Sequence, residues 1–152
     1  MLMMMFPAEG GLEARKQKVR EDFERYPSWE DKYRYLIDLS KQLDPLTDEE
    51  KQDKFKVKGC QSQVWLVPSL GQERMFFKAD SDALLVKGLV ALMVHLYSGL
   101  TAQESLKLGP DFLKELGLLS HLSLNRSNGL FAMIKQIHLY AQVQLAQQKL
   151  KG

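Results

Sequence analysis

One segment, from Leu84 to Leu96, constrains the fold more than any other because it is apolar around almost its whole circumference. A helix with no polar face must be buried inside a protein or cross a membrane. The longest stretch without a charged side chain, Gly88 to Gln103, contains His95 and Ser98 and falls short of the ~20 apolar residues that a membrane span needs. We therefore expect a buried central helix that ends at Gly99, with the rest of the chain packed around it.

Apolar residues at helical spacing predict further helices on both sides of this segment. They cover residues 12–26, residues 28–43, short stretches after Thr101 and Gly109, and a long C-terminal segment beyond Ser123. Ser28 offers N-cap chemistry to the second helix, and the run Asp80-Ser81-Asp82 offers it to the central helix. Thr47 and Glu50 have the spacing of a capping box, which predicts one short turn.

Three short segments between the helices are rich in β-branched and aromatic residues, which indicates strands. They are residues 55–57, 63–67 and 74–78, and short connections join them. Strands joined by short turns pair antiparallel. We expect an α+β fold with a small antiparallel β-sheet of about three strands, helices packed on one side, and a long C-terminal helix.

The composition is typical of one domain, which we assign to residues 1–152. No Pro/Gly/Ser-rich linker divides the chain, and the Met-rich residues 1–10 are expected to form a flexible N-terminal arm. The net charge is only +2, and acidic residues interrupt the basic ones, so neither nucleic acid nor a membrane is an expected partner. We see no export signal, which favours a soluble protein in the reducing cytoplasm.

The chain contains a single cysteine, Cys60. One thiol excludes an internal disulfide, a CxxC redox pair and ligation of an iron–sulfur cluster by one chain alone. A lone cysteine is most often a small buried hydrophobe, but Cys60 follows Gly59 on a polar loop that also carries Lys56 and Lys58. Because nearby cations favour the thiolate, this loop is a candidate site for sulfur chemistry.

Other candidate chemistry is weakly supported. The three histidines His95, His121 and His138 are possible bases for a cysteine nucleophile, but the first and last lie in apolar helical contexts. Asp80 and Asp82 are better explained as helix caps than as metal ligands, and we expect no metal site. The sequence contains no HExxH, no Walker phosphate loop and no GxGxxG.

Several stretches in the same order resemble the SufE-like family of sulfur-acceptor proteins. The segment from Val57 to Leu66, which includes Lys58-Gly59-Cys60-Gln61-Ser62, is similar to the family's cysteine signature. The other matching stretches are 33–39 before Asp44-Pro45-Leu46, 80–89, 118–122 and 125–133. The resemblance covers about residues 20–145, and the Met-rich first ten residues depart from it.

This resemblance implies a sulfur acceptor and activator of a pyridoxal-phosphate-dependent cysteine desulfurase. Cys60 would take persulfide sulfur by thiolate attack and pass it to a downstream iron–sulfur scaffold complex. The resemblance places Arg126 on the partner-facing surface, and it places Gly59, Gln61, Gln63 and Lys58 around the thiol. It implies no cofactor in this chain, an uncertain standing as an enzyme, and a monomer or weak homodimer.

Two other functions stay open on the sequence alone. The chain could be an iron–sulfur scaffold that binds a cluster in an oligomer, since one chain supplies only one thiolate. Alternatively, it could be a non-catalytic interaction module in which Cys60 is structural. The sequence does not determine whether Cys60 is buried in the free protein.

Overall fold

Helix α3 (Leu84–Tyr97) lies at the centre of the fold, as the apolar segment predicts. The structure is a computed structural model that describes residues 6–151. Ten consecutive residues of α3, from Gly88 to Tyr97, are buried. The remaining elements are α1 (Leu12–Arg25), α2 (Trp29–Ser40), η1 (Asp53–Phe55), β1 (Val64–Ser69), β2 (Phe76–Ser81), α4 (Ala102–Lys107), α5 (Pro110–Glu115), η2 (Leu119–His121) and α6 (Leu124–Lys151).

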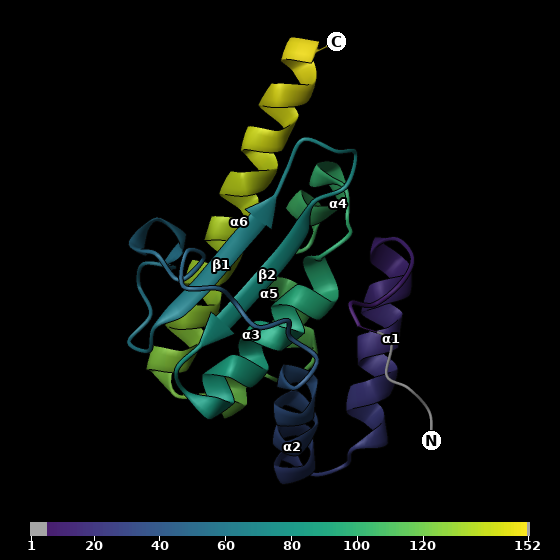
Figure 1. Cartoon of the computed structure of the whole chain (residues 1–152). Helices are drawn as coiled ribbons and strands as arrows, with labels where there is room; N and C mark the ends of the chain where they lie inside the picture. The colour runs from purple at the N-terminus through teal and green to yellow at the C-terminus, as the bar shows by residue number, and fades with distance from the viewer. Residues whose placement is uncertain (1–5, 152) are drawn as a thin grey trace.

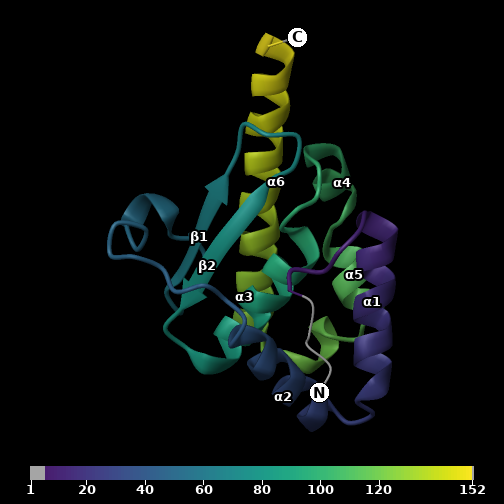
Figure 2. The same ribbon diagram turned by 45° about the vertical axis from the view of Figure 1, so that its right-hand side comes forward.

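The strands form a β-hairpin, and the helices gather behind one of its faces (Figure 1). Strands β1 and β2 pair antiparallel, with Val64 opposite Ser81 and Ser69 opposite Phe76. Alternate residues of β2, Phe77, Ala79 and Ser81, are buried, whereas the intervening ones are not. Figure 2 shows α3 and α6 next to the hairpin, with α1 farther from it. The α+β class and the long C-terminal helix are therefore confirmed.

The sheet of the described residues has two strands, so the expectation of about three was wrong. Residues 55–57 make only a single bridge, between Lys56 and Trp65, and their chain continues from the 3-10 turn η1. The N–H of Val57 still donates to the carbonyl of Val64 at 2.8 Å. Beyond Val57 the chain turns away into residues 58–62, so too few residues pair with β1 to form a third strand.

The prediction that Asp80-Ser81-Asp82 caps α3 was also wrong. Strand β2 continues to Ser81, and the N-cap of α3 is Ala83, whose side chain makes no capping hydrogen bond. Asp82 instead accepts a hydrogen bond from the backbone N–H of Gln63 at 3.0 Å. The Asp82 carboxylate thus links the start of β1 to the end of β2 instead of capping α3.

Helix packing is closest between α2 and α3. A Cβ atom built on Gly88 would lie 3.0 Å from the backbone carbonyl carbon and oxygen of Leu36. Glycine is therefore the residue that lets these two helices approach. Helix α2 ends at Ser40, a turn earlier than expected, and the N–H groups of Lys41 to Leu43 close it with short-range bonds. The capping box of Thr47 and Glu50 forms as predicted.

The N-terminal segment was expected to be a flexible arm over residues 1–10, and residues 1–5 of it lie outside the described part. From Phe6 onward the chain packs on α3. Ala8 is buried and its N–H donates to the carbonyl of His95 at 3.1 Å, while the Phe6 ring stacks on the His95 ring. Within residues 6–151, no helix combines the length and the apolar character needed to cross a membrane.

Candidate functional site

The Cys60 loop, residues 58–62, lies between Val57 and strand β1 and rests on the first turns of α6. Gly59 adopts a φ of +95°, a region that glycine favours, so the turn needs this residue. A Cβ atom built on Gly59 would lie 3.4 Å from the Cβ of Ala132 on α6. The loop is therefore held close to the helix, which fixes the direction in which Cys60 points.

The thiol of Cys60 faces Gly129 of α6. Its sulfur lies 3.6 Å from the carbonyl oxygen of Gly129, to which the S–H donates. A Cβ atom on Gly129 would lie 3.4 Å from the same sulfur, so the absence of a side chain leaves space for the thiol. Cys60 is half-buried, and burial raises the pKa of its thiol above the usual value.

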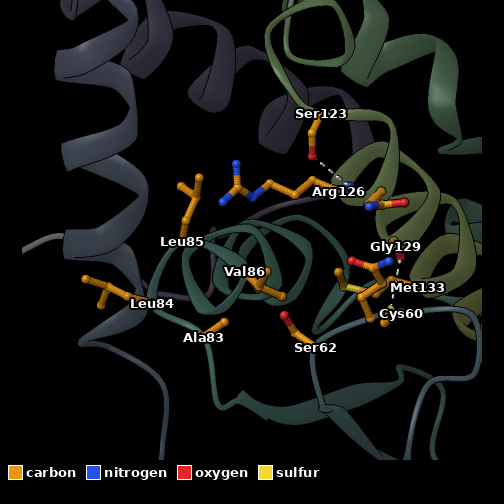
Figure 3. A pocket seen from close by; sticks show the side chains of 12 residues that line it. Cys60, Ser62, Ala83, Leu84, Leu85, Val86, Ser123, Arg126, Gly129 and Met133 are labelled. Carbon is orange, nitrogen blue, oxygen red and sulfur yellow. Dashed lines mark hydrogen bonds between the residues drawn. The ribbon is translucent and has the colours of Figure 1, made fainter.

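A pocket of about 370 Å³ opens beside this thiol. Its lining comes from three segments that are distant in the sequence: the Cys60 loop, the start of α3, and the start of α6. The lining residues are Cys60, Gln61, Ser62, Ala83, Leu84, Leu85, Val86, Ser123, Asn125, Arg126, Gly129 and Met133. Figure 3 shows the Cys60 side chain close to Met133 and Gly129, at one end of this pocket.

Arg126 occupies the other part of the pocket. Its side chain extends toward Leu85, away from Cys60 (Figure 3). Its backbone N–H donates to the Ser123 hydroxyl at 3.3 Å, which fixes the start of α6. Among the described residues, no carboxylate forms an ion pair with the Arg126 guanidinium. The pocket therefore presents a sulfur atom and a cation without a fixed anionic partner.

Of the other predicted site residues, the structure places only some at the pocket. Gly59 forms the turn and Gln61 lines the pocket, but Lys58 and Gln63 do not line it. The backbone N–H of Gln63 donates to Asp82, at the base of the hairpin. Lys56 forms an ion pair with Asp53 at 3.2 Å. Neither lysine is a cause of the shift in the pKa of the thiol, which burial raises.

Sequence reasoning missed Gly129 and Met133 as neighbours of the thiol. A glycine inside a helical pattern was the available signal, because such a residue often marks a close approach. The local sequence does not show that the group close to Gly129 is the Cys60 thiol.

The three histidines do not provide a base in this pocket, since none of them lines it. His95 is fully buried in α3, and burial lowers its pKa to about 4. His121 stacks on the Trp29 ring with a centroid distance of 4.0 Å. His138 lies with Nε2 2.8 Å from the carbonyl oxygen of Leu108. This geometry gives no support to a hydrolase with a cysteine–histidine pair.

The fold and the site together define a small α+β protein that presents one half-buried cysteine at a pocket between a hairpin loop and two helices. The chain belongs to the SufE family, because the model of the family, described as "SufE: Fe-S metabolism associated domain", matches residues 17–141. The protein is thereby associated with iron–sulfur metabolism.

A solved structure shares this fold. It is the solution structure of a hypothetical protein from Thermus thermophilus, with a TM-score of 0.74 and 18% sequence identity. The similarity covers 87% of this chain and 96% of that one.

Proposed function

We propose that this protein accepts sulfur from a pyridoxal-phosphate-dependent cysteine desulfurase, activates that enzyme, and passes the sulfur on for iron–sulfur cluster assembly in the cytoplasm. Family membership supports the link to iron–sulfur metabolism. The observation that carries the proposal is the position of the only cysteine, which lies at an open pocket and not in the core. The chain needs no cofactor of its own for this role.

The proposed chemistry is an exchange at sulfur. The Cys60 thiol loses its proton, and the thiolate attacks the outer sulfur of the persulfide on the donor enzyme. The new bond joins that outer sulfur to the sulfur of Cys60, and the donor's S–S bond breaks. The donor cysteine leaves as a thiolate and takes up a proton. One sulfur atom has then moved, with no external oxidant or reductant.

The pocket suits a cysteine that carries a second sulfur. A persulfide lengthens the side chain by one S–S bond of about 2.05 Å. The space of about 370 Å³ beside Sγ can hold the added atom. Gly129 contributes to this space because it has no side chain next to Sγ. A sheltered persulfide would also be protected from oxidation to higher acids.

The mouth of the pocket has features of a docking surface. Leu84 lines the pocket and is 65% exposed, and Leu124, which lies between two lining residues in the chain, is 75% exposed. Large apolar side chains this exposed are typical of interaction sites when they gather around a functional group. Arg126, which lines the same pocket, has no carboxylate partner among the described residues, and a guanidinium can bind a carboxylate of a partner in bidentate geometry.

The raised pKa of Cys60 predicts that the thiol reacts slowly before the donor docks. A thiol with a raised pKa is almost fully protonated at neutral pH, and the protonated form does not attack sulfur. We expect the donor to change the surroundings of the thiol when it binds, so that the thiolate forms only in the complex.

The test is mass spectrometry of the chain after turnover with a cysteine desulfurase and cysteine, in the absence of reductant. We expect the wild-type chain to gain the mass of one sulfur atom, and the Cys60→Ser variant to gain none. Transfer to the Cys60→Ser variant would overturn the proposal. So would a wild-type chain that gains no sulfur and does not stimulate the desulfurase.

The two alternative functions give different results. An iron–sulfur scaffold would acquire a visible absorption spectrum and form an oligomer on anaerobic reconstitution with iron and sulfide. An interaction module with a structural Cys60 would bind its partner equally well as the Cys60→Ser variant and would never carry sulfur.

A further inference from the structure

The C-terminal helix α6 exposes an unusual amount of apolar surface. Of the seven large hydrophobic side chains that are exposed among the described residues, five lie on this helix. A surface helix normally places apolar residues on its buried face and polar residues on the other. Helix α6 already has a separate apolar face that packs in the core, with Leu130, Ile134 and Ile137 buried. The exposed apolar residues are therefore additional to those that folding requires.

Three of these five residues form a continuous row with the exposed Ala146, and we call this row the α6 stripe: Leu139, Val143, Ala146 and Leu150. Leu139 is 46% exposed, Val143 47% and Leu150 89%, and Ala146 is exposed as well. Their spacing of four, three and four residues is the spacing of a heptad seam, which places them on one face of the helix. Figures 1 and 2 show the C-terminal part of α6 extending beyond the hairpin.

The α6 stripe begins close to the Cys60 loop. Ala132 lies one heptad before Leu139 on the same face, and Ala132 is the residue on which Gly59 rests. At 1.5 Å per residue, the stripe starts about 10 Å along the helix from this contact and ends about 27 Å from it. A molecule that covers the Cys60 loop can therefore continue along the same face of α6.

The charges of α6 indicate what kind of surface it meets. The helix contains no Asp or Glu, and Lys135 and Lys149 flank the stripe. Within the described residues, no lysine or arginine of α6 forms an ion pair, whereas most arginines and lysines of α1 and α2 do. Two copies of α6 packed against each other would bring together like charges without any carboxylate. A second copy of this chain is therefore a poor occupant.

We infer that the α6 stripe is a second docking surface for the sulfur donor, and that it takes an amphipathic helix of the donor with acidic residues beside its apolar face. A helix fits because the stripe has heptad spacing, and acidic flanks fit because Lys135 and Lys149 form no ion pair with a described residue. This inference rests on the proposed function, since it names the surface that keeps the donor in place while Cys60 reacts.

The experiment measures the Kd of a cysteine desulfurase for the wild-type chain and for two double variants. Leu139→Ser with Val143→Ser removes apolar contacts, and Lys135→Glu with Lys149→Glu reverses the charge. We expect each to weaken binding about tenfold, as loss of central apolar contacts or of complementary charge does at protein interfaces. The effect of the lysine variant should shrink as salt is added.

Two matched controls are available. Phe76 is 46% exposed, as Leu139 is, but it lies on β2, so Phe76→Ser should leave the Kd unchanged. Lys114 is an exposed lysine of α5 that forms no ion pair with a described residue, so Lys114→Glu should also leave it unchanged. Because the exchanged side chains are at least partly exposed, circular dichroism should show that all variants fold.

Unchanged Kd values for both double variants, with sulfur still reaching Cys60 of the wild type, would overturn the inference and leave the proposed function intact. Failure of the wild type to take sulfur would instead overturn the proposed function. The inference would also be overturned if the stripe variants abolished self-association, or abolished binding to vesicles of phosphatidylcholine and phosphatidylglycerol, while donor binding stayed the same.

Discussion

At the scale of single residues, the reactivity of Cys60 is governed by burial. Lys56 and Lys58 are close to Cys60 in the sequence, which suggested that cations stabilise the thiolate. Neither lysine is a cause of the shift in the pKa of the thiol, and Lys56 instead pairs with Asp53. Sequence proximity therefore gave the wrong sign for the shift in pKa, because the side-chain directions depend on how the loop rests on α6.

The thiol should consequently react slowly at neutral pH in the free protein. We expect the rate of alkylation by iodoacetamide to rise with a midpoint above the pH of about 8.5 that is usual for cysteine. The same chain unfolded in guanidinium chloride should show the usual midpoint and serves as the control. A midpoint below that of the unfolded chain would contradict the burial argument.

His95 is a second residue whose surroundings change its titration. Its side chain is fully buried and both ring nitrogens lack a hydrogen-bond partner among the described residues. Burial lowers its pKa from 6.5 to about 4, because the charged ring would lose its hydration. Within the folded protein His95 is thus neutral at physiological pH, and it packs as an aromatic ring against Phe6.

This shift predicts a loss of stability in acid. Between pH 6.5 and about 4 the unfolded chain binds a proton at His95 that the folded chain does not, so the free energy of unfolding falls as the pH falls. The loss should reach about 3 kcal/mol below pH 4, the equivalent of the shift in pKa.

Urea denaturation at several pH values measures this effect. The His95→Leu variant should lack this part of the pH dependence, and at neutral pH it should be about as stable as the wild type, because it removes two buried unpaired nitrogens. Equal acid sensitivity in His95→Leu and wild type would show that His95 is not the group responsible.

At the scale of elements, the sequence predicts what is determined locally. The helical periodicity correctly placed α1, α3 and α6, and the apolar circumference of α3 predicted its burial. The errors occurred where a partner from elsewhere decides the structure. Residues 55–57 have strand character but make only a single bridge to β1, and Asp82 binds Gln63 instead of capping α3.

The contact between α2 and α3 is another feature that local sequence does not reveal. Glycine weakens a helix, yet at Gly88 it is needed, because a Cβ atom built there would lie 3.0 Å from backbone atoms of Leu36 in α2. In Gly88→Ala the methyl group would meet backbone atoms of Leu36, which cannot rotate away. We expect a loss of about 2 kcal/mol of stability, despite the better helix propensity of alanine.

Thermal denaturation checks this value, since 2 kcal/mol corresponds to a fall in Tm of roughly 4–8 °C for a domain of this size. Asn128→Ala is the matched control, because Asn128 is an exposed position of α6 where alanine raises helix propensity without a clash. A Gly88→Ala protein as stable as the control would mean that the two helices can separate at little cost.

At the scale of the whole molecule, the candidate site exists only because three distant segments converge. The cysteine itself was found from the sequence, because it is the only one and because its loop resembles a family signature. The pocket could not be predicted, because it forms only where residues 83–86 at the start of α3 and residues 123–133 at the start of α6 meet the Cys60 loop. Gly129 became significant only when the fold placed the thiol against its carbonyl.

Because of this arrangement, we expect the Cys60 loop to open without unfolding of the whole protein. Residues 58–62 make no backbone hydrogen bonds with other described residues, and the thiol makes one weak bond to Gly129. A segment held by so few bonds opens locally at a low free energy, whereas α3 opens only with the whole core. Cys60 should therefore become accessible through movement of its loop alone.

The rate of alkylation in urea tests this separation. Local opening exposes little surface, so the rate should change little with urea until the unfolding transition begins. Gly88→Ala should lower the transition midpoint and leave the rate below the transition unchanged, because α3 does not move when the loop opens. If exposure of the thiol required global unfolding, the rate would instead rise steeply with urea and would be faster in Gly88→Ala. A loop that opens independently lets a docking partner reach the sulfur without a loss of stability in the core.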